Sequence, residues 1–374
     1  MDGPVTTPGA AGIDPGPPAP RRVSASRGAP SWKLRLLVSA TAFVLSAGLV
    51  IAVGEVALQS LAPKSDPVKL GVKLPHSARQ YGLQPNVRTL QTGVEVATNS
   101  LGFREKDYPV AKPAGVRRIV VLGDSYTLGV GVKFEDTFSK RLESELNAST
   151  RGYEVINFGV SGYNTVMELA TFREVAAAFQ PDLVLVAYVL NDAERAPEVG
   201  QAPPEAPGPA RSPLGLIGAA HLGLKDKSML YRYLSPKVGA GLGLIGARYA
   251  VGNTSQIIRS YDDSSVGWVD SRQALLEIVR HARTIKATTL VVVFPMILDF
   301  RTYPLTPAHD KITRFCRDHG IDVLDLLPRL RGEEASELLV FLDGHPNAKA
   351  HGIFADAIVN HLAPGAGARA GRAP

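Results

Sequence analysis

Cysteine is almost absent from this sequence. The 374 residues include a single cysteine, Cys316, so no disulfide can form within the chain. A zinc site built from several cysteines is excluded for the same reason. Cys316 occurs in an apolar helical pattern with Ile312 and Phe315, which indicates a core residue. One cysteine says little about the compartment in which the protein works.

Basic patches of the kind that bind nucleic acid are also missing. The formal net charge is only +6, and no cluster of basic residues is interleaved with aromatic ones. We therefore expect no nucleic-acid partner. Much of the positive charge lies near the N-terminus, where it is typical of membrane orientation. These cations are Arg21, Arg22, Arg27, Lys33 and Arg35.

One long run without charge is present near the N-terminus. Residues 36–54 are nineteen uncharged and mostly apolar residues, and as a helix they would span about 28 Å, close to the thickness of a bilayer core. Basic residues precede the run, whereas Glu55 and Asp66 follow it with only Lys64 nearby. The positive-inside rule then predicts a cytoplasmic N-terminus and export of everything after about residue 60.

Two other interpretations of this run remain open. A cleaved signal peptide has an apolar region of about 7–15 residues, and Pro63 would be poorly placed beside its cleavage site. A buried core helix does not fit the preceding residues 1–32, which are rich in Pro, Gly, Ala and Ser and are expected to be disordered. We favour an uncleaved, single-pass anchor in the cell membrane over residues 33–60.

From residue 117 onward, predicted strands and helices alternate, which indicates a parallel sheet covered on both faces. We expect a three-layer α/β/α sandwich of flavodoxin-like topology, with five parallel strands. Thr306 and Pro307 are expected to be the N-cap and the first residue of a helix, and the last helix should cover about 348–362. The expected strands are residues 118–123, 153–158, 182–189, 288–295 and 321–326.

Composition predicts how the chain is divided. Residues 195–260 interrupt the alternation of strands and helices, and their apolar pieces are too short to span a membrane. A loop this long is a lid, a binding element or a disordered insertion; we favour a cap over the site, with membrane contact as an alternative. The predicted divisions are a disordered cytoplasmic tail (1–32), the anchor (33–60), a tether and small β-rich lead-in (61–116), an α/β domain (117–364) containing the cap-like insertion (195–260), and a disordered tail (365–374).

A Gly-Asp-Ser turn follows the first predicted strand of the α/β domain. Gly123 breaks the apolar run and leaves Asp124 and Ser125 at the strand's carboxyl end, where open α/β sheets bind ligands. A serine in this place can present both its hydroxyl and its backbone N–H to one substrate atom. These residues also form ordinary turns, so the rest of the chain must supply a base and an oxyanion site.

The C-terminal part supplies a candidate base. Asp343 and His345 lie on a loop before the last helix, at the same sheet edge as Ser125, although an Asp-Gly-His turn alone is usually a surface loop. Asp343 could orient the imidazole, and His345 could accept the serine proton. Gly162 follows the second strand and Asn191 the third, so both are candidate oxyanion donors, together with the N–H of Ser125.

With these four blocks in chain order, the sequence resembles the GDSL-like, or SGNH, hydrolase superfamily. The matching residues are Gly123-Asp-Ser125, Gly162, Asn191-Asp192 and Asp343-Gly-His345, and the resemblance covers residues 117–364. It implies serine-dependent acyl transfer without a metal or an organic cofactor. It also implies that Asp124 and Asp192 are structural and that His351 is a packing residue.

The sequence departs from the family pattern in two places. Val189 stands where many relatives have a glycine. Asp343 lies two residues before His345, whereas the acid of many esterases lies three before; the shorter spacing resembles that of exported sugar O-acetyltransferases. Asn99-Ser-Leu-Gly-Phe-Arg104 resembles a segment of membrane-anchored bacterial members.

Three functions follow as hypotheses. The first is an exported, membrane-tethered serine esterase that removes acyl groups, O-acetyl above all, from small molecules or cell-envelope glycans. The second is an O-acyltransferase that uses the same triad to acylate a glycan hydroxyl. The third is a catalytically silent, glycan-binding envelope protein, which would not need both Ser125 and His345.

Overall fold

In the structure, a computed structural model, the chain forms two compact units, Met1–Ala57 and Leu58–Pro374. Nearly all of residues 1–32, most of the 195–260 insertion, Asp343 and residues 365–374 lie outside the described residues. The described residues are Gly3, Gly16 and residues 31–61, 70–149, 152–194, 254–340 and 344–363.

One long helix, α1 (Trp32–Leu61), provides most of the described residues of the first unit and lies where the sequence predicts an anchor. Its stretch Arg35–Ala57 has a mean hydropathy of 2.4, and none of its most apolar window is buried by the described chain. Large apolar side chains such as Phe43 and Leu45 are exposed. A helix that is apolar on all sides suits a lipid environment. α1 is long and apolar enough to cross a membrane, and a signal sequence near the N-terminus would share these properties.

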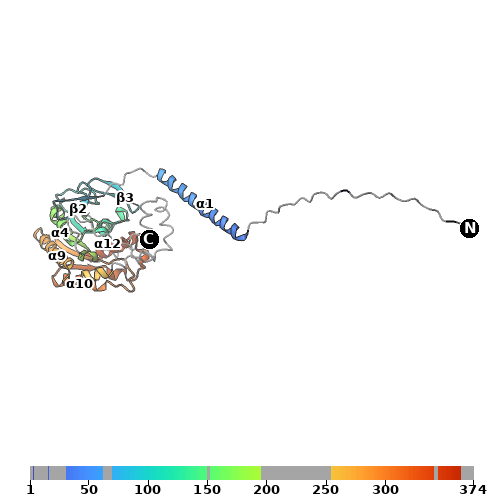
Figure 1. The fold of residues 1–374 in the computed structure, drawn as a ribbon. Coiled ribbons are helices and arrows are strands. Elements are labelled where there is room, and N and C mark those ends of the chain that lie inside the picture. The colour runs from blue at the N-terminus through green and yellow to red at the C-terminus, as the bar shows by residue number, and fades with distance from the viewer. Residues whose placement is uncertain are drawn as a thin grey trace. The chain divides into compact units, whose positions relative to one another are not determined.

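Five parallel strands form the sheet of the second unit, in the order β6-β5-β7-β8-β9. Figure 1 draws this unit as a ribbon, with the helices α4, α9, α10 and α12 labelled. β5 lies between β6 and β7, so the second, first and third strands of the predicted domain are neighbours, as in flavodoxin-like sheets. The carboxyl ends of these three strands therefore meet at one edge. The strands are β5 (Arg117–Gly123), β6 (Tyr153–Asn157), β7 (Leu183–Val189), β8 (Thr288–Phe294) and β9 (Asp322–Asp325).

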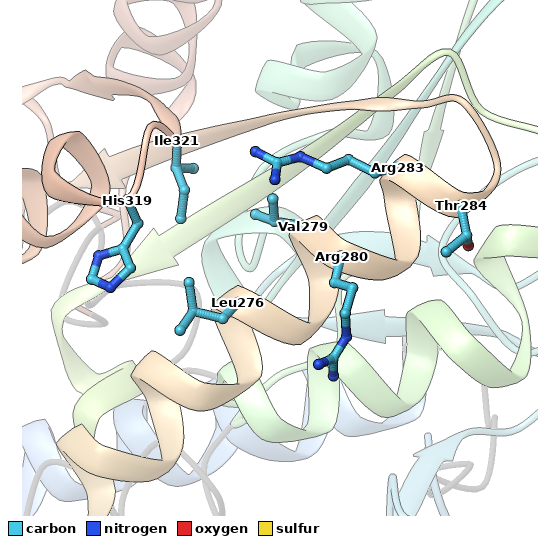
Figure 2. A pocket seen from close by; sticks show the side chains of 7 residues that line it. All are labelled: Leu276, Val279, Arg280, Arg283, Thr284, His319 and Ile321. Atoms are coloured by element: carbon cyan, nitrogen blue, oxygen red, sulfur yellow. The ribbon is translucent and has the colours of Figure 1, made fainter.

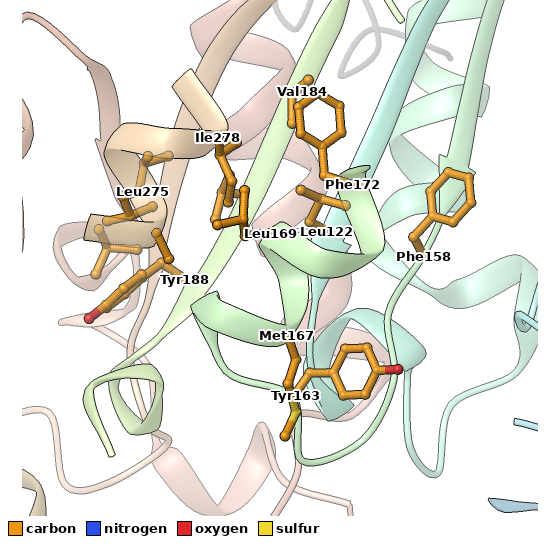
Figure 3. Packing of buried hydrophobic residues seen from close by; sticks show 14 of the residues in the cluster. Leu122, Phe158, Tyr163, Met167, Leu169, Phe172, Val184, Tyr188, Leu275 and Ile278 are labelled. Carbon is orange, nitrogen blue, oxygen red and sulfur yellow. The ribbon is translucent and has the colours of Figure 1, made fainter. Parts of the chain in front are cut away.

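Helices cover both faces of this sheet, which confirms the predicted three-layer sandwich. Successive residues of β5 point to opposite faces: Val120 and Leu122 join one buried cluster, whereas Ile119 and Val121 join the other. Figure 3 shows the first cluster, where side chains of α4 and α9 gather over the sheet. α4 (Thr165–Glu174), α9 (Val266–Thr284) and α10 (Thr306–Asp318) contribute to the first cluster, and α3 (Phe138–Ser149), α11 (Leu327–Leu330) and α12 (Ala348–Leu362) to the second.

Residues 70–116, which we call the lead-in, precede β5 and contain two small antiparallel hairpins. Phe103 follows the second hairpin and is buried. Its ring packs edge-on against that of Phe158, with 4.9 Å between ring centroids. The hairpin strands are β1 (Gly71–Lys73) with β2 (Tyr81–Leu83), and β3 (Arg88–Gln91) with β4 (Val94–Ala97). The lead-in is therefore packed against the α/β core.

The start of α10 differs from the prediction by one residue. Leu305 is the N-cap, and Thr306 is the first helical residue. The Thr306 hydroxyl donates to the carbonyl oxygen of Tyr303 at 3.1 Å instead of accepting from the first turn of the helix. Pro307 is tolerated within this first turn because N–H groups there have no intrahelical partner. The last helix covers the predicted residues.

Candidate active site

Ser125 is the first residue of the short helix α2 (Ser125–Leu128), directly after β5. Asp124 is the N-cap, and its side chain accepts a hydrogen bond from the N–H of Tyr126 at 2.8 Å. Gly123 leaves no room for a side chain, because a Cβ there would lie 2.1 Å from the hydroxyl oxygen of Thr127. The turn therefore presents a half-buried serine at the carboxyl edge of the sheet.

The segment after β6 runs beside this turn. The N–H of Val160 donates to the carbonyl oxygen of Gly123 at 3.1 Å, and the Asn157 side chain donates to the carbonyl oxygen of Thr127 at 2.6 Å. Further along the same segment, Gly162 has a φ of +78°, a conformation that favours glycine. The predicted oxyanion donor Gly162 thus lies on a segment that is hydrogen-bonded to both sides of the Ser125 turn.

Asn191 lies in the short 3₁₀ helix η3 (Leu190–Ala193), directly after β7. Its amide nitrogen donates to a carboxylate oxygen of Asp124 at 3.4 Å. This contact places the amide next to the N-cap of the helix that carries Ser125. Since a side-chain amide has two N–H groups, Asn191 keeps a second donor besides the one that it gives to Asp124.

His345 lies on the loop before α12. Its ring packs edge-on against Tyr126, the residue after Ser125, with 6.1 Å between ring centroids. The backbone oxygen of His345 accepts from the N–H of Val340 at 2.7 Å, and Asn347 caps the N-terminus of α12. These contacts hold both ends of the loop. The neighbouring Asp343 lies outside the described residues.

Three buried carboxyl groups surround the base of this site: Asp124, Glu168 on α4 and Asp192 in η3. Burial raises the pKa of all three, most strongly for Glu168 and Asp192, and repulsion from Asp124 raises the pKa of these two further. Thr165 donates to Asp192 at 3.2 Å, whereas neither carboxylate oxygen of Glu168 has a hydrogen-bond partner among the described residues. Glu168 and Asp192 therefore favour their protonated, neutral forms.

His351 is fully buried on α12. Its Nδ1 accepts a hydrogen bond from the N–H of Phe138 at 3.0 Å, and its ring stacks on the Phe138 ring. Burial lowers the pKa of His351 to about 3. The imidazole is therefore neutral at physiological pH, and it serves as a packing group and hydrogen-bond acceptor.

A cavity of about 550 Å³ lies elsewhere in the unit (Figure 2). It is lined by residues of α9 and of the segment between α10 and β9, at the amino end of the strands. No predicted site residue lines it. Within the described parts of the chain, no group of three or more His, Cys, Asp and Glu side chains is arranged to hold a metal ion.

The sequence matches the GDSL-like Lipase/Acylhydrolase family over residues 121–353, more than half of the chain. The chain belongs to this family. As a GDSL-like lipase/acylhydrolase, it is a serine ester hydrolase, and its substrate is acylated. Among curated proteins, none matches the sequence.

Three solved structures illustrate the similarity of fold. The chain is similar to TesA at 16% identity and a TM-score of 0.39, over 66% of this chain and 99% of TesA. It is similar to a catalytic mutant of Axe2, an acetylxylan esterase from Geobacillus stearothermophilus, at 14% identity and a TM-score of 0.41, over 67% and 96% of the two chains. It is also similar to a two-domain esterase (CEX) active on acetylated mannans, at 15% identity and a TM-score of 0.40. This match covers 66% of this chain and 48% of the esterase.

Several residues near the site were not found by sequence reasoning. Tyr81 of the lead-in donates to the carbonyl oxygen of Ser161, beside Gly162, and its sequence context carries no signal of this role. Glu168 occurs in an ordinary helical pattern. Arg104 belongs to the Asn-Ser-Leu-Gly-Phe-Arg segment that we noted only for its resemblance to other members. All three depend on contacts between distant parts of the chain.

Proposed function

We propose that this GDSL-like hydrolase is an exported, membrane-tethered esterase that cleaves acyl esters with a Ser125-His345-Asp343 triad. In this proposal the N–H of Ser125, the N–H of Gly162 and the side chain of Asn191 form the oxyanion hole. The favoured substrate is an O-acetylated cell-envelope glycan.

One observation carries the proposal: three chain segments touch the turn of Ser125 from different sides. Asn191 donates to Asp124, the residue before Ser125, and His345 packs against Tyr126, the residue after it. The segment leading to Gly162 bonds to Gly123 through Val160. Such a meeting of a serine, a histidine and candidate oxyanion donors is what acyl transfer requires.

In the first step, the Ser125 hydroxyl oxygen attacks the carbonyl carbon of the ester, and His345 accepts the hydroxyl proton. The carbonyl oxygen becomes an oxyanion, which the three proposed donors stabilise. When the tetrahedral intermediate collapses, the C–O bond to the alcohol breaks, and His345 returns its proton to the leaving oxygen. The products are a free hydroxyl group on the substrate and an acyl-serine.

In the second step, water attacks the acyl-serine while His345 accepts a proton from it. Collapse of this second intermediate breaks the bond to Ser125, which takes the proton back from His345. A carboxylic acid leaves, and the enzyme is restored. Asp343 would hold the imidazole in the required tautomer during both steps.

The location and the substrate class rest on the N-terminal helix. α1 is long and apolar enough to cross a membrane, and basic residues cluster directly before its uncharged run, whereas the first basic residue after that run is Lys64. By the positive-inside rule, the α/β domain would then lie on the outer side of the cell membrane. Acylated glycans of the cell envelope are the esters that a domain tethered there would meet.

The spacing of Asp343 and His345 favours a second candidate, an O-acyltransferase. In that reaction a sugar hydroxyl takes the place of water in the second step. The two activities are separated by supplying a glycan acceptor: a transferase forms an acylated glycan in proportion to the acyl donor consumed, whereas an esterase releases the free acid.

The test uses the full chain purified in detergent, with p-nitrophenyl acetate as substrate and a fluorophosphonate as probe of the nucleophile. We expect turnover and covalent labelling of the wild type, and loss of both in Ser125→Ala. Ser264→Ala is the matched control, because Ser264 is exposed and is none of the proposed catalytic or oxyanion groups. Labelling that persists in Ser125→Ala would overturn Ser125 as the nucleophile, and a wild type that is neither active nor labelled would favour the silent binding protein.

A further inference from the structure

The hydroxyl of Tyr81 contacts the segment proposed to supply an oxyanion donor. Tyr81 is the first residue of β2 in the lead-in, and its hydroxyl donates to the carbonyl oxygen of Ser161 at 3.0 Å. Burial, and to a smaller extent repulsion from the Asp124 carboxylate, raises the pKa of Tyr81 to about 12, so the phenol keeps its proton.

The hydrogen bond is made to the peptide unit that also contains the N–H of Gly162. The carbonyl of Ser161 and the N–H of Gly162 belong to one planar trans peptide, in which the two groups point in opposite directions. A donor that holds the carbonyl on one side therefore sets the direction of the N–H on the other. The same bond polarises the peptide and makes its N–H a stronger donor.

Glycine at position 162 allows the close approach of the Tyr81 hydroxyl. A Cβ at Gly162 would lie 2.8 Å from the Tyr81 hydroxyl oxygen, and the φ of +78° is unfavourable for a side chain. Gly162 is thus needed both for the backbone conformation and for the close approach of Tyr81.

Tyr81 is held firmly from its own side. Tyr163 donates its hydroxyl to the backbone oxygen of Tyr81, and the two rings pack edge-on with 5.3 Å between centroids. Nearby in the lead-in, Arg79 forms an ion pair with Glu174 at the end of α4, with 2.8 Å between nitrogen and oxygen. The two tyrosines therefore form a reciprocal pair: each hydroxyl bonds to the backbone of the other's segment.

We infer that Tyr81 is a positioning residue of the oxyanion hole, which it serves by orienting the Ser161–Gly162 peptide toward the Ser125 site. The inference rests on the proposed function, since it assigns the N–H of Gly162 to the oxyanion. If Tyr81 has this role, the lead-in is a part of the active site, and only the residues before the lead-in serve as a tether.

Tyr81→Phe in the full-length protein is the decisive variant, because it removes one oxygen and keeps the ring that packs on Tyr163. We expect kcat for p-nitrophenyl acetate to fall about tenfold, which is less than the roughly 10²- to 10³-fold for outright loss of an oxyanion donor, because the N–H of Gly162 is misdirected but still present. KM should change less than about twofold. Binding of a trifluoromethyl ketone, which forms an oxyanion on the serine, should weaken by a similar factor. The unfolding midpoint reports whether the fold is kept.

Tyr108→Phe is the matched control. Tyr108 also lies in the lead-in, is half-buried, and donates its hydroxyl to the α/β core, at 3.0 Å from a carboxylate oxygen of Glu143. Tyr108→Phe should lower the unfolding midpoint about as much as Tyr81→Phe does, but its kcat should stay at the wild-type value. As a second variant, 3-fluorotyrosine at position 81 keeps the hydroxyl as a stronger donor and should retain wild-type kcat or exceed it.

Equal kcat and equal ketone affinity in Tyr81→Phe and Tyr108→Phe would overturn the inference, provided that the wild type is labelled by the fluorophosphonate at Ser125. If Tyr81→Phe did not fold, a 3-fluorotyrosine protein with tenfold lower kcat would overturn it. A wild type without labelling or turnover would refute the proposed function itself and the role of Tyr81 with it. The labelling experiment thus separates the two failures.

Discussion

The guanidinium of Arg104 donates to the backbone oxygen of Gly129 at 2.7 Å, directly after the short helix that begins with Ser125. The same side chain also donates to the backbone oxygens of Leu128 at 3.0 Å and Val132 at 2.8 Å. It is almost completely buried, and burial lowers the pKa of Arg104 to about 10, so it still carries its charge at neutral pH. A residue of the lead-in thus fixes the C-terminal end of the Ser125 turn.

We predict that Arg104→Met lowers the free energy of unfolding by about 3 kcal/mol, because several buried carbonyl oxygens lose their charged donor. Urea unfolding of the full chain in detergent measures the change. Arg301→Met is the control, since its ion pair with Glu334 is exposed and such pairs contribute about 0–1 kcal/mol. Equal losses in the two variants would contradict the role of Arg104 in the turn.

Asn191→Ala should reduce kcat about 10²- to 10³-fold, as expected for the loss of one oxyanion donor. His345→Ala should cost several orders of magnitude, because the proton of Ser125 then has no acceptor. Steady-state kinetics with p-nitrophenyl acetate distinguish the two sizes of effect. Asn360→Ala, which changes an exposed asparagine of α12, is expected to keep wild-type turnover. An Asn191→Ala protein with unchanged kcat would exclude this amide from the oxyanion hole.

The buried imidazole of His351 should make the protein lose stability in mild acid. Its pKa is about 3 in the folded state, below the usual value of 6.5, because burial disfavours the charged form. The unfolded chain therefore binds a proton as the pH falls below 6.5, whereas the folded chain does not until about pH 3. The burial of His351 therefore does not reduce the free energy of unfolding above pH 6.5. Below pH 6.5, it reduces this free energy by up to about 1.4 kcal/mol per pH unit.

His351→Gln should flatten this slope of unfolding free energy between pH 6.5 and pH 4, because the amide cannot be protonated in that range. Denaturant unfolding at a series of pH values gives the slope for each protein. His76→Gln, at an exposed position of the lead-in, should leave it unchanged. The same slope in wild type and His351→Gln would mean that other groups cause the acid sensitivity.

Glu168 should destabilise the folded protein increasingly as the pH rises. Burial raises the pKa of Glu168 well above its usual value, so the folded state holds a proton that the unfolded state releases above about pH 4.5. Glu168→Gln should therefore stabilise the protein, by more at pH 8 than at pH 5. Thermal unfolding at the two pH values measures this, with exposed Glu135→Gln as control. A stabilisation that does not grow with pH would contradict the burial of an ionisable carboxyl.

The predicted orientation of α1 can be tested in cells. Protease added to intact spheroplasts should remove the α/β domain and leave a short N-terminal fragment, because the basic residues before α1 keep the N-terminus inside. A tag at the N-terminus should be digested only after the membrane is opened. A protected α/β domain would reverse the orientation, and a mature protein that lacks α1 would favour the signal peptide.

Much of the architecture could be predicted from local patterns. The apolar run of β5 and the helical period of α12 were recognisable because strands and helices bury faces with periods of about 2 and 3.6 residues. Strand ends and short motifs then placed Ser125, Gly162 and Asn191 at one edge of the sheet. The start of α10 was off by one residue, because the Thr306 hydroxyl found a partner in the preceding loop instead of its own helix.

The sequence by itself determined the α/β order of elements, the apolar helix and the candidate chemistry, since each of these is encoded within a few neighbouring residues. Only the tertiary structure decided what surrounds that chemistry. Tyr81 bonds to a residue 80 positions away, and Arg104 holds a turn more than 20 positions later. No local pattern encodes such pairs, because they arise only when packing of the whole domain brings a donor and an acceptor together and removes the water that each would otherwise bind.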